Sequence, residues 1–276
     1  MRAVSAHLSA ALLAVFIALP APSAETPVTH RFPGIATAYA VAIDGRLTWA
    51  ANPDLPRQPA SLAKLLTALV LLDDWQPLAE VTVSAAAAGI EGSRIGLRKG
   101  EVLTASDLLT GMLVRSGNDA CLALVERAAA STPSFALRMN QRAAELGMRN
   151  SRFVHPCGLD APDQRTTVRD LLLLGEAAGR NLEIRQRSAM ASAAVRTRNG
   201  RELRFHNSNA LIGRQAETSG LKSGYTSKAG NCLIATAERS GHRVQLVLLG
   251  APDRWWEAAG IIAQALSAEA PGPRLD

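Results

Sequence analysis

The amino-acid sequence predicts an α+β fold, with an antiparallel sheet built from both chain ends, helices packed on it and a helical subdomain. Three observations point to this fold: a strand pair near the start, a block of helices in the middle, and strands followed by a helix at the end. All of these strands can be covered only if those from both ends share one sheet. The helices between them then form an insert beside that sheet.

The elements near the start of the chain are a hairpin and a buried helix. Residues 37–50 hold two strand-like runs around Asp44 and Gly45, a pair typical of a tight hairpin turn. Residues 61–72 are almost continuously apolar, and such a segment predicts a helix that is buried all round.

Helices fill the middle of the sequence, and strands return in its last third. The apolar spacing predicts helices over residues 118–130, 134–147 and 166–178, the second ending at a glycine. The last third holds two strand runs and a closing helix, over residues 229–237, 243–249 and 253–266. A turn at residues 240–242 joins the two strand runs.

The composition is that of a folded protein rather than a disordered one. The chain has 276 residues, 47% of them hydrophobic and 20% charged, and both shares are ordinary for globular proteins. The formal net charge of +6 suits an anionic wall polymer or an anionic lipid, although a mild excess of solvated arginines explains it equally well. No nucleic-acid motif accompanies the charge, so we expect no nucleic acid partner.

The first 24 residues have the pattern of a secretory signal peptide, with a cleavage position that is fixed only to within a residue or two. A positive start at Arg2 precedes an uncharged apolar run over residues 7–19, and small residues follow up to Ala24. That run is shorter than the roughly 20 residues of a membrane span, so cleavage is favoured over an uncleaved anchor. We therefore expect an exported protein, periplasmic or otherwise extracytoplasmic, with one domain over residues 25–270 and a frayed tail over residues 271–276.

Ser61 and Lys64 are the first candidates for chemistry. They stand three residues apart in the predicted apolar helix, and residues at this spacing share one helix face. A serine hydroxyl becomes a nucleophile when a base takes its proton, and a lysine can be that base if burial lowers its pKa. Taken alone, this SxxK pattern is weak because it recurs often by chance.

Two further polar motifs interrupt apolar stretches. Ser116 and Asn118 flank a glycine between two predicted helices, where a helix-cap turn is the favoured interpretation when the motif is taken alone. Residues 222–226 begin with Lys222 and precede an apolar strand run. An edge strand of this kind offers a cation and hydroxyls to a carboxylate, and its glycine allows another backbone to approach closely. A plain polar hairpin strand explains that second motif equally well.

In this order, the motifs SxxK, SxN and K[ST]G resemble the signature of penicillin-binding proteins and serine β-lactamases. The similarity to the low-molecular-mass D-alanyl-D-alanine carboxypeptidases and endopeptidases extends over roughly the whole mature chain. Its main stretches are residues 59–68, 96–101, 107–119 and 221–230. The resemblance implies a β-lactamase/transpeptidase-like fold and identifies residues 25–270 as a penicillin-binding serine peptidase domain.

The resemblance also implies a role for each motif residue. Ser61 would be the acylated nucleophile, Lys64 its base and Ser116 a proton relay. The substrate-binding residues would be Asn118, Lys222, Ser223, Gly224, Tyr225 and Thr226. The substrates would be peptidoglycan stem peptides, β-lactams such as penicillins would be acylating inhibitors, and no cofactor is implied.

Two features depart from the pattern of the carboxypeptidases. Ser223 stands where they usually carry threonine, which keeps a hydroxyl but removes a methyl group. Many carboxypeptidases also continue into a second domain and a membrane anchor, whereas this sequence ends just after the closing helix. That ending resembles the endopeptidase branch and leaves membrane association open.

Several activities fit this resemblance. A D-alanyl-D-alanine carboxypeptidase is the leading interpretation, and a D,D-endopeptidase that cleaves cross-links is the alternative. A class A β-lactamase uses a loop glutamate for deacylation, but residues 153–165 hold Asp160 and Asp163 and no glutamate. A non-catalytic homologue that only binds peptidoglycan conflicts with the intact motifs.

The cysteines and histidines are expected to have structural roles. Three cysteines leave at least one unpaired, and we expect Cys121 and Cys232 to be small buried core residues. No cysteine or histidine spacing is typical of zinc, so we predict no metal. The histidines of the mature chain are expected in turns or loops, at His30, His155, His206 and His242.

Overall fold

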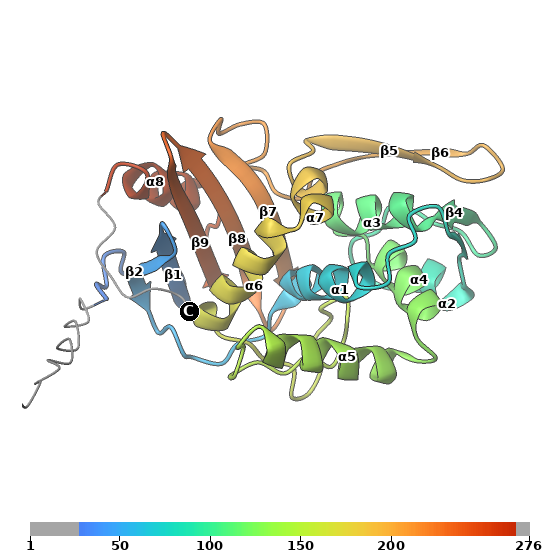
Figure 1. Ribbon diagram of the computed structural model, residues 1–276, viewed down its shortest axis with the longest axis horizontal. Helices are drawn as coiled ribbons and strands as arrows, with labels where there is room; N and C mark the ends of the chain where they lie inside the picture. The colour runs from blue at the N-terminus through green and yellow to red at the C-terminus, as the bar shows by residue number, and fades with distance from the viewer. Residues whose placement is uncertain (1–27, 269–276) are drawn as a thin grey trace, which may run out of the picture.

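The computed structural model describes residues 28–268, and a five-stranded antiparallel sheet lies at one side of it (Figure 1). The strand order is β2-β1-β9-β8-β7, so two strands from the beginning of the chain and three from its end form one sheet and meet where β1 pairs with β9. The strands are β1 (Ala38–Ile43), β2 (Arg46–Ala51), β7 (Thr218–Thr226), β8 (Gly230–Arg239) and β9 (His242–Ala251). The prediction that both ends of the chain share one sheet is confirmed.

The predicted hairpin turn joins β1 to β2. Asp44 and Gly45 both have positive φ, 50° and 74°, which a tight hairpin turn of this hand requires. The Asp44 carboxylate accepts a hydrogen bond of 2.8 Å from the backbone N–H of Arg243 at the start of β9. The turn is thereby fastened to the next strand of the sheet.

The two faces of the sheet are covered by different helices, because side chains alternate along each strand. In β1, Tyr39 and Val41 face the cluster under α8 (Trp256–Ala265), whereas Ala38 and Ala40 face the larger core. Helix α6 (Val168–Arg180) crosses the second face (Figure 1). Small alanines on that side let the helix approach the sheet closely.

The helical subdomain surrounds α1 (Ala63–Leu72). Every residue from Ala63 to Leu71 is buried, as the continuous hydrophobicity of this segment predicted. The other helices of this part are η1 (Ala60–Leu62), α2 (Ala85–Gly89), α3 (Ala105–Val114), α4 (Asn118–Ala128), α5 (Thr132–Glu145) and α7 (Leu182–Ser188). The predicted helices are present here with bounds shifted by a few residues.

Some short elements were not expected from the sequence. A hairpin of β5 (Ser192–Arg196) and β6 (Glu202–His206) extends along the helical subdomain (Figure 1). A smaller pair, β3 (Glu80–Thr82) and β4 (Val102–Thr104), lies beside it. His206 was expected in a turn or loop and instead ends β6, because β6 exposes every second residue and lacks the apolar run by which the longer strands were recognised.

Cys121 is buried in the core, as expected, but it is not a free thiol. Its sulfur is bonded to that of Cys157 in a disulfide that bridges 36 positions of sequence. Cys232 is a free, buried cysteine, as expected. Both cysteines are buried, so the apolar sequence around Cys121 could not distinguish a disulfide-bonded cysteine from a free thiol in the core.

The predicted signal peptide, residues 1–24, and the predicted tail, residues 271–276, lie outside the described residues. Within residues 28–268, no helix combines the length and the hydrophobicity needed to cross a bilayer.

Candidate active site

A cleft of about 300 Å³ opens where the edge strand β7 meets the helical subdomain. The three predicted motifs converge on it, although they are far apart in the sequence. Its lining includes Ser61, Ser116, Asn118, Ser223, Gly224, Tyr225 and Thr226, together with Gly92, Ser93, Gly158, Leu159, Ser208 and Arg254. Lys64 and Lys222 lie buried behind this lining.

Ser61 lies in the short helix η1, directly before α1. Ala60 before it has a left-handed φ of 48°, a conformation that is uncommon for a residue with a Cβ. This bend turns the chain from an irregular segment into the buried helix. Ser61 is thereby left at the mouth of the cleft, one helical turn from Lys64.

Lys64 is wholly buried, and its ammonium nitrogen has three partners. Nζ lies 2.9 Å from Ser61 Oγ and 2.7 Å from Asn118 Oδ1, and it also donates to the carbonyl oxygen of Cys157. Burial lowers the pKa of Lys64 to about 7, and the Asp119 carboxylate partly opposes this shift. A neutral amine has two N–H groups for the amide and carbonyl oxygens, which leaves its lone pair for the Ser61 hydroxyl.

The second motif forms the break between α3 and α4. Ser116 adopts a left-handed φ of 64°, and its side chain lines the cleft. Asn118 is held from two sides, because its N–H donates to Ser93 O at 2.7 Å and its Nδ2 donates to Glu91 O at 2.7 Å. The amide is therefore fixed with its Oδ1 toward Lys64.

Asp119 supports this arrangement from behind, and sequence motifs gave no signal for it. Its buried carboxylate accepts hydrogen bonds from three successive backbone N–H groups, those of Ile95, Gly96 and Leu97. Hydrogen bonds to a carboxylate are stronger than neutral ones. They hold the loop that carries Gly92 and Ser93 against the start of α4.

The third motif lies on β7, at the edge of the sheet, as expected. Lys222 is 1% exposed, and its Nζ donates to Ser223 O at 2.8 Å. Burial lowers its pKa well below the usual range, and the nearby charges of Lys64 and Arg254 lower it further. At Gly224, a Cβ would stand 2.8 Å from the backbone nitrogen of Ser61, so only glycine lets this strand approach the nucleophile so closely.

The hydroxyls of Ser223 and Thr226 on β7 are already engaged by protein groups. Ser223 Oγ donates to Ser208 O at 3.0 Å. Thr226 Oγ1 donates to Asp160 Oδ1 at 2.6 Å, so the predicted loop aspartate holds this end of the strand. Tyr225 is 64% exposed beside the cleft.

The family follows from comparison with known proteins. The sequence profile of the family described as D-alanyl-D-alanine carboxypeptidase matches residues 26–253. The chain belongs to the D-alanyl-D-alanine carboxypeptidase family. This confirms the resemblance that the three motifs indicated.

Relatives within the D-alanyl-D-alanine carboxypeptidase family differ in length. The carboxypeptidase DacF of Bacillus subtilis is 29% identical over 75% of this chain and 54% of its own length. This chain thus spans about half the length of some curated relatives that it matches. The D-alanyl-D-alanine endopeptidase of Pseudomonas aeruginosa is 32% identical over 90% of this chain and 81% of its own.

The fold agrees with that of solved members of the D-alanyl-D-alanine carboxypeptidase family. The crystal structure of a D-alanyl-D-alanine carboxypeptidase from Mycobacterium tuberculosis is 28% identical, with a TM-score of 0.82. The match covers 91% of this chain and 97% of that one. The predicted α+β, β-lactamase/transpeptidase-like fold is therefore confirmed.

Besides Asp119, two other parts of the site were not predicted from the sequence. Arg254 lies in the cleft lining and donates from Nη1 to Gly224 O at 2.6 Å, yet no motif surrounds it. The loop at Cys157 and Gly158 packs directly on the residue before Ser61: a Cβ on Gly158 would stand 1.9 Å from Ala60 O.

Proposed function

We propose that the protein is a serine-type D-alanyl-D-alanine carboxypeptidase that acts on peptidoglycan stem peptides through an acyl-enzyme on Ser61. One observation carries the proposal: the wholly buried Lys64 nitrogen lies 2.9 Å from Ser61 Oγ, with a pKa lowered to about 7. A base with such a pKa is half deprotonated near neutral pH, where it can both accept and return a proton.

Acylation begins with attack of Ser61 Oγ on the carbonyl carbon between two D-alanines. Neutral Lys64 accepts the hydroxyl proton while Asn118 Oδ1 and the Cys157 carbonyl hold its two N–H groups. The developing oxyanion would lie between the backbone N–H groups of Ser61 and Tyr225. Losing one such donor typically costs about 3 kcal/mol of transition-state stabilisation.

The second half of the cycle returns the protons. Ser116, in the lining of the cleft, would relay a proton from Lys64 to the departing D-alanine amine. Water then attacks the acyl carbon, and Lys64 with Ser116 would activate that water. The products are free D-alanine and the shortened stem peptide, and Ser61 Oγ regains its proton.

The charge of the cleft supports an anionic substrate. Arg254 lines it and remains cationic. The lowered pKa of the buried Lys222 would rise beside a bound anion, which would favour its charged ammonium form. We propose that Lys222, Ser223, Gly224 and Thr226 contact the substrate carboxylate or its equivalent. Asn118 would contribute through its hold on Lys64. The Thr226 hydroxyl must then leave Asp160 or share its bond with it.

A D,D-endopeptidase is the second candidate, favoured by one observation. The Pseudomonas aeruginosa relative that carries that name is 32% identical over 90% of this chain. Both activities break chemically similar bonds, so products from monomeric and cross-linked muropeptides distinguish them. A fast β-lactamase is disfavoured because Asp160 is engaged by Thr226 and by the Lys228 N–H.

We propose that the protein acts outside the cytoplasm. The pattern of residues 1–24 supports export, and so does the Cys121–Cys157 disulfide, because disulfides persist mainly in oxidising compartments. β-Lactams are the expected acylating inhibitors.

Labelled penicillin tests the nucleophile. The protein is incubated with it, and the modified peptide is identified by mass spectrometry. The expected result is one acyl group on Ser61, absent from Ser61→Ala and retained in Ser192→Ala, a matched change at an exposed serine. Thermal unfolding of Ser61→Ala must match that of the wild type. Labelling at another residue, or none in the folded wild type, would refute the proposal.

A further inference from the structure

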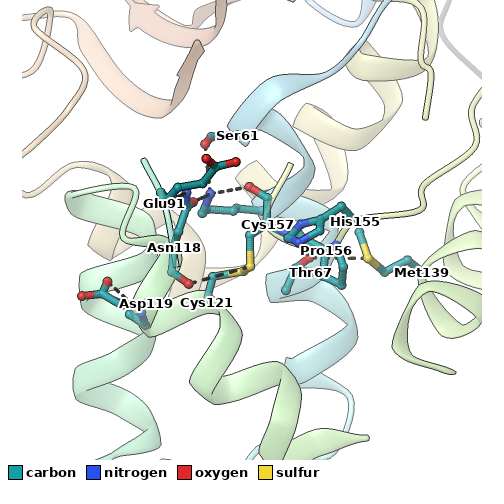
Figure 2. Close-up of a disulfide and its surroundings, with 12 residues drawn as sticks. Ser61, Thr67, Glu91, Asn118, Asp119, Cys121, Met139, His155, Pro156 and Cys157 are labelled. Carbon is teal, nitrogen blue, oxygen red and sulfur yellow. Dashed lines mark hydrogen bonds between the residues drawn. A yellow bond between two sulfur atoms is a disulfide. The ribbon is translucent and has the colours of Figure 1, made fainter. Parts of the chain in front are cut away.

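The Cys121–Cys157 disulfide lies directly behind the candidate active site. Cys121 stands one helical turn after Asn118 on α4, and Cys157 belongs to the loop between α5 and α6. The two Cα atoms are 5.9 Å apart. Figure 2 shows the disulfide between α4 and the segment from His155 to Cys157, below Asn118 and Ser61.

The loop that carries Cys157 is packed against the helix of the nucleophile at three successive residues. The Pro156 carbonyl accepts a hydrogen bond of 2.7 Å from Thr67 Oγ1. The Cys157 carbonyl accepts one from Lys64. Gly158 has a φ of +78°, and its missing Cβ makes room for the backbone of Ala60.

The disulfide therefore joins the two groups that orient the Lys64 amine. One is Asn118 Oδ1 on α4, and the other is the carbonyl oxygen of Cys157 itself. Without the sulfur–sulfur bond, these acceptors belong to segments that are held together by noncovalent contacts alone. A shift of about 1 Å in a catalytic geometry is enough to cost about 100-fold in rate.

We propose that the Cys121–Cys157 disulfide positions Lys64 for proton transfer, so that the protein becomes competent for acylation only after the disulfide has formed. The inference rests on the proposed function, because acylation of Ser61 is the reaction that it modulates. Cys121 and Cys157 are positioning residues in this role, since neither contacts the substrate.

The bond forms by thiol–disulfide exchange with an oxidant that is itself a disulfide. The thiolate of one cysteine attacks the oxidant, forms a mixed disulfide and releases one thiol. The second cysteine, as a thiolate, then displaces the other half of the oxidant. The protein loses two protons and two electrons, and the oxidant leaves as two thiols. Because both cysteines are 1% exposed or less, we expect the exchange during folding rather than in the folded protein.

The pH dependence of acylation reports on Lys64 specifically. The charged group that shifts its pKa is Asp119 on α4. Lys222 on β7 and His155 in the loop also face it, and the charge of Lys64 lowers the pKa of both. Burial is the main cause of its lowered pKa. A loosened loop would admit water to the amine, and the pKa of Lys64 would rise.

The test compares rates of acylation by a fluorescent penicillin over a range of pH. The variants are the double replacement Cys121→Ala/Cys157→Ala and the control Cys232→Ala, which removes the free buried thiol. At pH 7 we expect the double variant to be acylated at least about tenfold more slowly, with the midpoint of its pH profile moved upward. The control should retain the wild-type rate and midpoint.

A second preparation avoids mutation. Wild-type protein refolded with dithiothreitol, which is then removed, should show the same defect. A second cycle of unfolding and refolding with oxidised glutathione should restore both the rate and the midpoint. All assays run at a temperature below the thermal unfolding midpoint of every sample, so that loss of folding does not mimic loss of positioning.

The outcomes separate this inference from the proposed function. If the oxidised wild type is not acylated, the proposed function fails, and this inference fails with it. If the wild type is acylated and the folded double variant matches its rate and midpoint, only the positioning role is refuted. A slower rate with an unchanged midpoint also counts against it, because the effect would not act through Lys64.

Discussion

Lys64 shows how the surroundings of one residue change its chemistry. In water a lysine is cationic at neutral pH. Here the apolar helix removes water, while Asn118 and Cys157 supply two acceptors and no negative charge. Asp119 is the nearby anion, and it acts mainly by holding backbone N–H groups. The charge of that carboxylate raises the pKa of Lys64 by less than burial lowers it.

The pKa of Lys64 sets the lower limit of the pH range for acylation. Neutral Lys64 is the form that accepts a proton, and burial lowers its pKa to about 7. We expect the acylation rate to fall about tenfold per unit below that pH and to level off above it. Stopped-flow acylation by a chromogenic cephalosporin measures this profile. A flat profile between pH 5 and about 8 would contradict the role of Lys64 as base.

Gly158 is expected to be intolerant of any side chain. In Gly158→Ala, the new Cβ would fall 1.9 Å from Ala60 O and push away the segment that precedes Ser61. We expect at least about 100-fold slower acylation, measured with labelled penicillin. Gly241→Ala is the matched control, because Gly241 also has a positive φ, +82°, but no atom lies near its Cβ position. Equal losses in both variants would mean that backbone conformation, not contact with Ala60, is responsible.

At the scale of elements, two ion pairs join the turn of the β5–β6 hairpin to the subdomain, and the pair of Arg201 with Glu101 is the more buried. Arg201 donates from Nε to Glu101 Oε1 at 2.6 Å and from Nη2 to Gly96 O at 2.9 Å. The Glu101 side chain is 8% exposed. The pair thus links the hairpin turn to the loop that Asp119 holds beside the cleft.

Removing this link should destabilise the protein by about 2 kcal/mol, the usual range for hydrogen bonds to a buried charge. Arg201→Ala is compared with Arg198→Ala, whose pair with Glu80 is exposed, at 71% and 56%, and is expected to contribute no more than about 1 kcal/mol. Urea unfolding at pH 7 measures both. Equal effects would contradict a special role for Arg201.

The same pair predicts the direction of a pH effect on stability. Arg201 lowers the pKa of Glu101 below its ordinary value of 4.5. A carboxyl with a depressed pKa in the folded state contributes stability above that ordinary value and loses it as the pH falls through the folded pKa. The difference in stability between wild type and Arg201→Ala should therefore shrink below a pH of about 4.5.

The predictability of these elements follows from their exposure. The hairpin around Asp44 and the helix of Ser61 could be predicted because most of their residues are apolar and buried. The β5–β6 hairpin could not, because it exposes every second or third residue and is rich in arginine. Its place is fixed by Arg201 and Glu101, which are 100 residues apart.

At the scale of the whole molecule, the three motifs could be predicted to converge because their order resembles that of a known family. The parts of the site that escaped prediction depend on three-dimensional proximity alone. Neither the pairing of Cys121 with Cys157 nor the contact of Arg254 with Gly224 leaves a local pattern in the sequence. An odd number of cysteines allows several pairings, and geometry alone selects one.

The pairing of an early strand with the last strand has a consequence for biosynthesis. β1 pairs with β9, and these strands are separated by about 200 residues. A nascent chain has no partner for one edge of β1 until nearly the last strand has been translated. Such long-range pairing is slow to form, and an unpaired edge invites association with other chains. Truncation of the chain before β9 should therefore yield aggregation-prone fragments rather than a smaller folded protein.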